Sequence, residues 1–219
     1  HSVIKLREIG ISPDVLICRS EAPLPAEVKE KISLFCDVPA EAVVESLNAN
    51  SIYEVPLRYE RLGLGDLVVK RLGLESRTSN HAEWEQIAES LQHPVQTVRV
   101  GVVGKYIANG DAYKSIREAL VHAGIPQRCE VQTVWIDSDA TENRQEMEAV
   151  LGEIDALVVA PGFGSRGIEG KITAVQVARE THLPFLGICL GMQMAVIEFA
   201  RNVAGLSGSN STEMDVNAA

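Results

Sequence analysis

Short apolar runs alternate with amphipathic segments through residues 97–204, and this alternation constrains the fold more than any other feature of the sequence. Strands that alternate with helices predict a parallel sheet joined by right-handed crossovers, with function gathered at the carboxyl ends of the strands. The predicted strands are 97–104, 130–136, 156–160 and 183–186, and the predicted helices are 112–123, 142–154, 172–182 and 192–204. The residues that follow each strand are therefore the first candidates for a site.

A cysteine stands at the predicted turn between the fourth strand and its helix. The segment 187–191 reads Gly-Ile-Cys-Leu-Gly, with Cys189 between two glycines. This is the pattern of a nucleophile elbow, a strained strand-to-helix turn that needs small neighbours. The following helix would direct unpaired N–H groups at the sulfur, which favours the thiolate. A lone strand cysteine is more often an inert small hydrophobe, but the glycines and the strand-to-helix switch favour a nucleophile.

Two backbone N–H groups are candidates to stabilise the oxygen of a carbonyl that this cysteine attacks. Such an oxygen gains charge and needs preorganised donors. Leu190, directly after the cysteine, is the natural first donor, and Gly162, after the neighbouring strand, is the natural second. Pro161 is excluded because proline has no N–H.

A general base for the cysteine is harder to find among the five histidines. His182 precedes the strand that leads to Cys189 and should lie about 20 Å away, at the other end of the sheet. The remaining histidines fit solvated or structural roles: His1, His81, His93 and His122. We therefore expect the base to lie beyond residue 219.

Composition excludes several functional classes. The net charge is −10 and no Lys/Arg cluster occurs, which argues against broad nucleic-acid binding through phosphates. No apolar stretch approaches the length of a membrane span. Four widely spaced cysteines, without a Cys-x-x-Cys pair, predict reduced thiols, a cytoplasmic setting and no metal site within the chain.

The chain divides into three parts by pattern. Residues 1–57 read as the end of an α/β domain, with short β-rich runs near 14–19 and 42–45. Residues 58–96 mix charged residues with scattered leucines and glycines, and predict a helical connector. Residues 97–219 form the regular α/β domain. Since the sequence starts with histidine in mid-element and ends without a closing element, we expect an internal excerpt of a longer polypeptide.

The segment 187–193, Gly-Ile-Cys-Leu-Gly-Met-Gln, resembles the nucleophile motif of class I (triad) glutamine amidotransferases. The chain resembles the CTP synthase family over almost its whole length. The segments that carry this resemblance are 1–3, 13–20, 34–36, 51–53, 103–106, 111–115, 162–170 and 210–213.

The resemblance implies a flavodoxin-like amidotransferase domain, incomplete here, preceded by a connector and the end of a P-loop-type α/β synthetase domain. It implies a ligase in which ATP phosphorylates UTP and ammonia from glutamine displaces the phosphate to give CTP. It further implies GTP as activator, CTP as product inhibitor, Mg²⁺ held by carboxylates outside this chain, and homotetramers that sometimes form filaments.

The same resemblance assigns roles to individual residues. Cys189 is the nucleophile, with Gly162 and Leu190 as oxyanion donors, and Phe163 and Gln193 belong to the glutamine site. The residues linked to GTP activation are Lys105, Arg166, Gly167 and Glu169. Arg19 and Lys31 match residues near the ATP adenine and the pyrimidine nucleotide.

Two alternatives compete with this interpretation. Another triad amidotransferase, serving guanine or carbamoyl phosphate synthesis, would share the elbow but not residues 1–57 or the segment 166–170. A non-catalytic assembly or nucleotide-sensing module would keep the fold without a poised thiolate. Rapid alkylation of Cys189 relative to the other three cysteines would distinguish the enzyme from the module.

Overall fold

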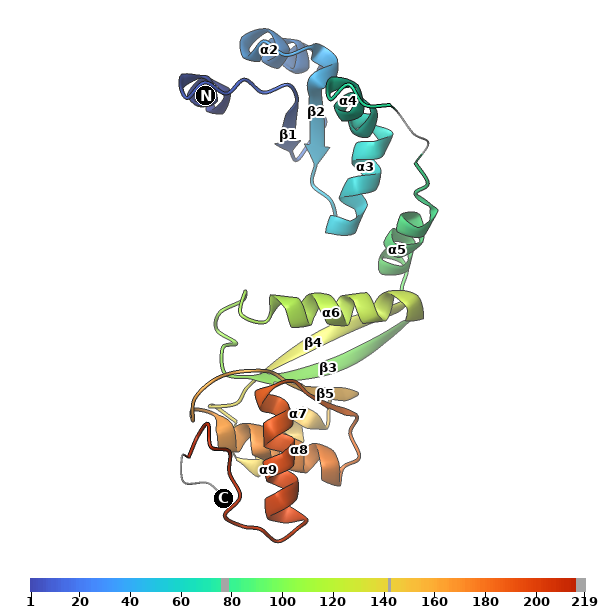
Figure 1. Cartoon of the computed structure of the whole chain (residues 1–219). Helices are drawn as coiled ribbons and strands as arrows, with labels where there is room; N and C mark the ends of the chain where they lie inside the picture. The colour runs from blue at the N-terminus through green and yellow to red at the C-terminus, as the bar shows by residue number, and fades with distance from the viewer. Residues whose placement is uncertain (76–78, 142, 216–219) are drawn as a thin grey trace. The chain divides into compact units, whose positions relative to one another are not determined.

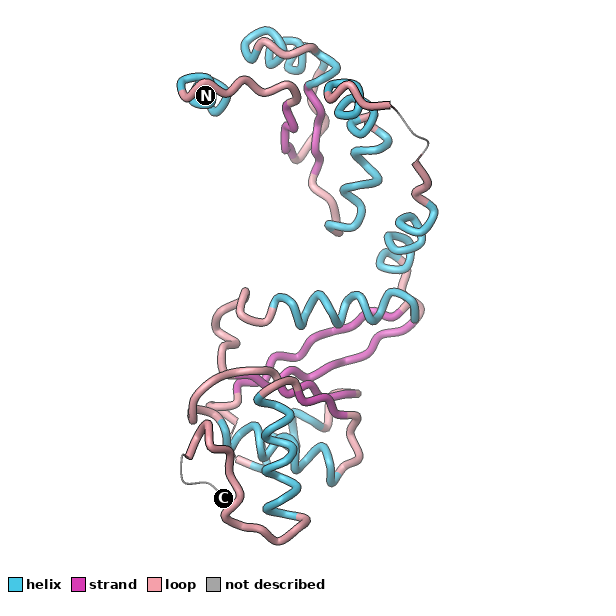
Figure 2. Tube along the Cα trace, in the orientation of Figure 1, coloured by secondary structure: helices cyan, strands magenta, loops and turns pink. Residues whose placement is uncertain are grey.

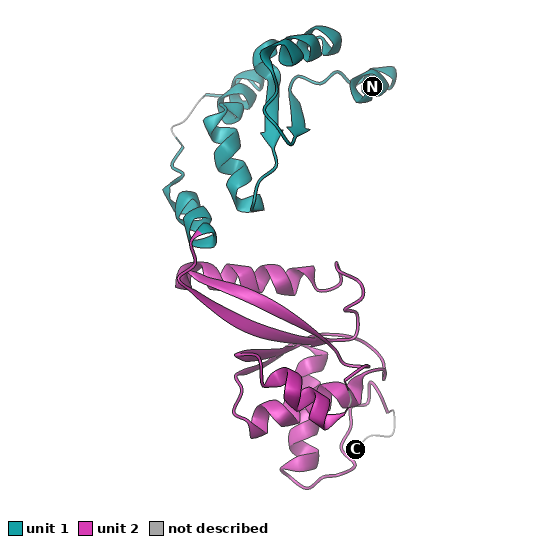
Figure 3. Ribbon diagram, turned by 180° about the vertical axis from the view of Figure 1, so that it is seen from behind, with its two compact units in different colours: residues 1–92 teal, residues 93–219 magenta. Residues whose placement is uncertain are grey.

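The structure is a computed structural model that describes residues 1–75, 79–141 and 143–215. Two compact units divide the chain, the first unit at His1–Gln92 and the second unit at His93–Ala219 (Figure 3). The sequence predicted three parts with separate roles: the end of a synthetase domain, a connector and an amidotransferase domain. This division stays a prediction. Residues 76–78, inside the predicted connector, lie outside the described residues.

The first unit is built on a two-stranded parallel sheet. Strand β1 (Leu16–Ser20) pairs with β2 (Val43–Leu47), from Leu16 opposite Val43 to Ser20 opposite Leu47. Both strands predicted in this region are present, each shifted toward the carboxyl end. The helical elements are α1 (Ser2–Glu8), α2 (Ala26–Cys36), α3 (Val55–Arg61), α4 (Leu64–Arg71) and α5 (Ala82–Gln92), with short 3₁₀ turns at Ala40–Ala42 and Ile52–Glu54.

The second unit contains a four-stranded parallel sheet in the order β4-β3-β5-β6. Figure 2 draws its strands in magenta. Its strands are β3 (Gln96–Gly104), β4 (Cys129–Asp137), β5 (Ala156–Val159) and β6 (Phe185–Gly187). Its helices are α6 (Lys114–Gly124), α7 (Arg144–Leu151), α8 (Ile168–Glu180) and α9 (Leu190–Asn202), with a 3₁₀ turn at Ile125–Gln127. The alternation of strands and helices predicted from the sequence is confirmed.

Helices cover both faces of this sheet, as Figure 1 shows. Successive strand residues point to opposite faces, and the two core clusters follow that rule. Val103, Leu157 and Val159 pack with α7, α8 and α9. Val102 and Val158 point the other way and pack with residues of α6. The near-continuous apolar sequence of β5 is therefore the signature of a strand buried on both faces.

The predicted helix borders differ from the observed ones at glycine-rich segments. We expected a helix from residue 172, but α8 begins at Ile168 because Gly167, with φ of 65°, turns the chain directly into the helix. Likewise α9 begins at Leu190, not at 192. Residue 142, where the second predicted helix starts, lies outside the described residues. Among the described residues, no helix is long and apolar enough to cross a membrane.

Candidate active site

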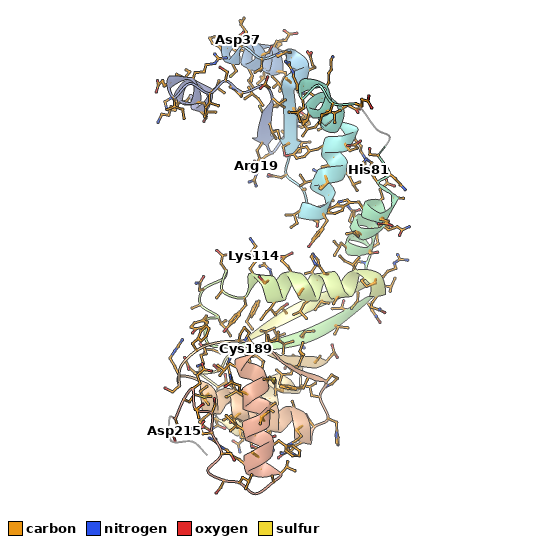
Figure 4. All side chains as sticks on the ribbon, viewed as in Figure 1. Arg19, Asp37, His81, Lys114, Cys189 and Asp215 are labelled. Atoms are coloured by element: carbon orange, nitrogen blue, oxygen red, sulfur yellow. The ribbon has the colours of Figure 1, made fainter. Side chains whose placement is uncertain are left out.

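Cys189 occupies a strained turn between β6 and α9, and Figure 4 labels it at the amino end of that helix. Its backbone has φ of 52° and ψ of −107°, a conformation that costs a non-glycine residue about 1–3 kcal/mol. The side chain is exposed. The Ile188 N–H donates to Val159 O at 3.0 Å, and the Gly191 N–H donates to Ile188 O at 2.9 Å. These bonds hold the turn, so the thiol is presented above the sheet edge.

The two glycines of the motif are required by packing at this turn. A Cβ on Gly187 would lie 2.7 Å from the backbone of Gly191. A Cβ on Gly191 would lie 2.0 Å from Val159 O, where the first turn of α9 crosses β5. Because both obstacles are backbone, a side chain at either position must displace a strand or a helix.

The predicted oxyanion donors lie close to one another. Leu190 opens α9, so its N–H is among those that lack an intrahelical partner. Gly162 follows β5, which pairs with β6 through Val159 and Gly187. A Cβ on Gly162 would stand 3.3 Å from Leu190 Cδ2. The structure thus brings Gly162, Leu190 and the cysteine turn to one edge of the sheet, while the donor roles stay predictions.

Gln193 lies one turn after Cys189 on α9 and is held by the segment that follows the helix. Ser211 Oγ donates to Gln193 Oε1 at 3.0 Å, and Gln193 Nε2 donates to Glu213 Oε2 at 3.2 Å. Phe163, the other predicted glutamine contact, is an exposed side chain in the loop after β5. Both residues border the cysteine edge, and the role of each in glutamine binding stays a prediction.

Lys105 and Arg166 fasten the loop after β5, which we call the lid segment (residues 162–167). The buried Lys105 Nζ donates to Phe163 O at 3.0 Å and to Gly164 O at 2.5 Å. Arg166 donates to Lys105 O at 3.0 Å, forms an ion pair with Asp139 and lies 5.9 Å from the Tyr106 ring. Burial lowers the pKa of the Lys105 ammonium, and Asp139 opposes this effect.

The other two residues predicted for GTP activation lie at the start of α8. Gly167 has a positive φ, and a Cβ there would stand 2.4 Å from Ser138 Oγ. The Glu169 carboxylate pairs with Arg201 of α9 at 3.2 Å. Lys105, Arg166 and Gly167 therefore gather around the loop after β4, whereas the side chain of Glu169 is directed to α9.

Comparison with known proteins agrees with this geometry. The family described as "Glutamine amidotransferase class-I" matches residues 109–218, and the family described as "CTP synthase N-terminus" matches residues 1–74. The chain belongs to the class-I glutamine amidotransferases, in the CTP synthase family. The fold class and the family expected from the elbow motif are confirmed.

Curated relatives extend the likeness across both units. The CTP synthase of Symbiobacterium thermophilum is 53% identical over 216 residues, which cover 97% of this chain and 40% of the relative. The CTP synthase of Methanocaldococcus jannaschii is 51% identical over 223 residues, which cover 99% of this chain and 41% of the relative. The chain thus spans about two fifths of the length of the curated relatives it matches.

A solved structure matches the amidotransferase part. The structure titled "Trypanosoma brucei CTPS - glutaminase domain with bound acivicin" is 40% identical with a TM-score of 0.52, and the match covers 55% of this chain and 47% of that chain. This likeness supports the parallel-sheet fold of the second unit.

Sequence reasoning missed one charged residue of this amidotransferase site. Lys171 of α8 has a fully buried side chain, and its Nζ donates to Ala160 O at 2.5 Å, just before the lid segment. Burial lowers its pKa to about 8, an effect that Lys105 reinforces and Cys189 opposes. A lysine on an amphipathic helix reads as solvated. The available signal was its place between Ile168 and Ile172, on the apolar stripe of the helix.

The two nucleotide residues predicted in the first unit lie on different elements. Arg19 of β1 donates to Asn48 Oδ1 at 3.3 Å after β2 ends, and Figure 4 labels it there. Lys31 is exposed on α2. Within residues 1–75, no hydrogen bond or ion pair joins the two side chains. Their roles stay predictions.

Metal ligands were expected outside this chain. Across the described residues, no group of three or more His, Cys, Asp or Glu side chains is placed to hold a metal ion. No Mg²⁺ ligand can therefore be assigned from these residues, and the magnesium expectation stays a prediction.

Proposed function

We propose that this chain carries parts of both catalytic halves of a CTP synthase, a ligase that aminates UTP with ammonia from glutamine at the expense of ATP. The observation that carries the proposal is the strained Cys189 turn, in the same chain as a match to the CTP synthase N-terminus. An amidotransferase of another pathway would explain the turn but not residues 1–74.

In the glutaminase half, the Cys189 sulfur attacks the side-chain amide carbon of glutamine. The N–H groups of Leu190 and Gly162 stabilise the oxygen as it gains charge. Ammonia leaves with a proton from the general base, and water then hydrolyses the thioester to glutamate. The base is a residue beyond position 219. Gln193 and Phe163 border the substrate and orient it.

In the synthetase half, ATP phosphorylates the 4-oxygen of UTP, and ammonia displaces phosphate to yield CTP, ADP and phosphate. Arg19 and Lys31 contact the nucleotides through charge-assisted hydrogen bonds. Mg²⁺, when bound, neutralises phosphate charge in such transfers, and it is held by residues outside this chain.

GTP activates the glutaminase half through Lys105, Arg166, Gly167 and Glu169, and the fastening of the lid segment by Lys105 and Arg166 supports this assignment. CTP acts as product inhibitor. The enzyme works in the cytoplasm as a homotetramer that also forms filaments, with reduced thiols and without binding nucleic acid or membranes.

The experiment that tests the proposal uses a chimera in which this chain replaces the aligned segment of the Symbiobacterium thermophilum CTP synthase. CTP formation from UTP and ATP is measured with glutamine and with ammonium. Cys189→Ala should abolish the glutamine reaction and keep the ammonium reaction, while the control Cys129→Ala should keep both. Glutamine activity that persists in Cys189→Ala removes Cys189 as nucleophile. If the unsubstituted chimera forms no CTP with glutamine and none with ammonium, the proposed CTP synthase activity is wrong.

A further inference from the structure

The hydroxyl of Tyr113 joins the ends of two neighbouring strands. Its side chain is buried at the amino end of α6. The hydroxyl accepts a hydrogen bond from the Lys105 N–H at 3.0 Å, directly after β3, and donates one to Pro161 O at 3.3 Å, after β5. These directions are fixed, because a backbone N–H can only donate and a carbonyl can only accept. Burial raises the pKa of the Tyr113 hydroxyl, so it keeps the proton that the second bond needs.

The Tyr113 ring is held in place by its neighbours. It stacks on Trp135 of β4, with the ring centroids 6.1 Å apart. A Cβ on Gly104 would stand 2.5 Å from the ring, so the ring occupies the space that a side chain at position 104 would need. The hydroxyl therefore reaches the two strand ends from a ring that is packed on the sheet.

The bond to Pro161 O acts on the peptide unit that carries a predicted oxyanion donor. Pro161 O and the Gly162 N–H belong to one planar trans peptide, so the two groups point in opposite directions. Proline fixes φ of residue 161, and rotation about ψ is left to turn this unit. A hydrogen bond at Pro161 O restrains that rotation and thereby directs the Gly162 N–H. In the described part of the chain that N–H donates to no protein oxygen, so it is available to a substrate.

Other side chains hold the neighbouring carbonyls of this segment. Lys171 donates to Ala160 O, and Lys105 donates to the carbonyls of residues 163 and 164. The hydroxyl of Tyr113 holds the carbonyl between them, at residue 161. Of these bonds, only the one from the hydroxyl acts on the peptide unit of the predicted donor.

We propose that Tyr113 is a positioning residue of the cysteine site: its hydroxyl fixes the peptide unit between Pro161 and Gly162, so that the Gly162 N–H is directed at the oxygen of the amide that Cys189 attacks. A donor that is already oriented needs no rearrangement when charge develops on that oxygen. This inference rests on the proposed glutaminase function and deepens it.

The proposal separates glutamine hydrolysis from the reactivity of the thiol. Attack on the glutamine amide places charge on its oxygen, which the donors stabilise. Alkylation by iodoacetamide displaces iodide and places no charge on a carbonyl oxygen. Loss of the Tyr113 hydroxyl should therefore slow hydrolysis and leave alkylation of Cys189 unchanged. Because the donor acts mainly in the transition state, kcat should fall while KM for glutamine is kept.

The test uses Tyr113→Phe in the chimera, which removes the hydroxyl and keeps the ring. Glutamate release and alkylation of Cys189, read by peptide mass, are both measured. The kcat for glutamine hydrolysis should fall about tenfold, less than the roughly 100-fold or more lost with a whole oxyanion donor, since the Gly162 N–H is still present. KM and the alkylation rate should change by less than about twofold. The matched control is Tyr106→Phe, at an exposed tyrosine whose ring centroid lies 6.2 Å from that of Tyr113, and it should keep all three values.

The outcomes support or overturn the proposal as follows. Slower hydrolysis with unchanged KM, unchanged alkylation and an unaffected control supports it. A folded Tyr113→Phe variant with the original kcat overturns it. A fall in hydrolysis and alkylation together also overturns it, as does a variant that fails to fold, because the hydroxyl would then maintain the turn as a whole. Failure of the proposed function would appear elsewhere, as glutamine-supported CTP formation that survives Cys189→Ala in the chimera.

Discussion

The two units bury their parallel sheets to different degrees. In the second unit, α6 covers one face and α7, α8 and α9 cover the other, so β3 and β5 are buried on both sides. In the first unit, two strands share a small cluster around Val38, Ala42 and Val43, and the apolar side chains of Leu34 and Phe35 on α2 stay exposed. Parallel strands and helices therefore enclose an extensive buried core in the second unit and only a small one in the first.

The largest expected effect is a difference in core sensitivity. Met147 of α7 is 0% exposed and Phe35 of α2 is 71% exposed. Met147→Ala should cost the second unit about 2–5 kcal/mol of unfolding free energy because it leaves a cavity. Phe35→Ala should change that of the first unit by less than about 0.5 kcal/mol.

Each unit carries its own fluorescent reporter for this measurement. Trp84 lies on α5 and its ring stands 6.3 Å from Tyr53. Trp135 lies on β4 and stacks on Tyr113 at 6.1 Å. Urea unfolding of single-tryptophan variants, Trp84→Phe or Trp135→Phe, reports on one unit at a time. Equal losses from the two alanine substitutions would contradict the contrast between the cores.

A smaller effect separates the thiols of the two units. Burial raises the pKa of the Cys18 thiol, with Cys36 acting in the same direction and Lys29 against it. Its thiolate therefore forms only at higher pH, whereas Cys189 is exposed at a helix amino end. Cys189 should react with iodoacetamide at neutral pH about tenfold faster than Cys18.

Peptide mass measured at several reaction times checks this ordering. Raising the pH should reduce the difference in alkylation rate between Cys189 and Cys18, because the Cys18 thiol has a raised pKa and ionises only at higher pH. Equal rates at neutral pH would favour the non-catalytic alternative over an enzyme with a poised nucleophile.

The smallest expected effects concern GTP activation and the KM for ATP. We expect the first to depend on the second unit and the second to depend on the first unit. In the chimera, Arg166→Ala should weaken GTP activation several-fold and leave the KM for ATP unchanged, because Arg166 lies in the lid segment and joins it to Lys105 O. Arg19→Ala in the first unit should raise the KM for ATP several-fold and leave GTP activation unchanged. Steady-state kinetics with ammonium and with glutamine measures both. A GTP response that survives Arg166→Ala would remove the lid assignment.

The sequence predicted what depends on local pattern. Alternating strands and helices, the Cys189 turn and its glycines were all visible because each leaves a periodic or positional mark within a few residues. The start of α8 was placed four residues late, since glycine-rich segments hide whether the chain turns into a helix or continues as a loop.

Contacts between distant segments left no such mark. The Arg166–Asp139 ion pair joins residues 27 positions apart, and charge alone does not say which acid an arginine meets. Lys171 is the sharper case. The sequence analysis did not single it out, and only the fold shows that its side chain is buried and that its ammonium donates to Ala160 O.

The contact of Gly191 with the Val159 carbonyl has an evolutionary consequence. A single methyl group at position 191 would overlap a strand backbone, so no series of small side-chain enlargements can reshape this turn while it keeps working. Sequence changes that affect the cysteine must therefore occur at residues around the turn. Residues around the nucleophile can be substituted, whereas the glycine at position 191 of the turn cannot.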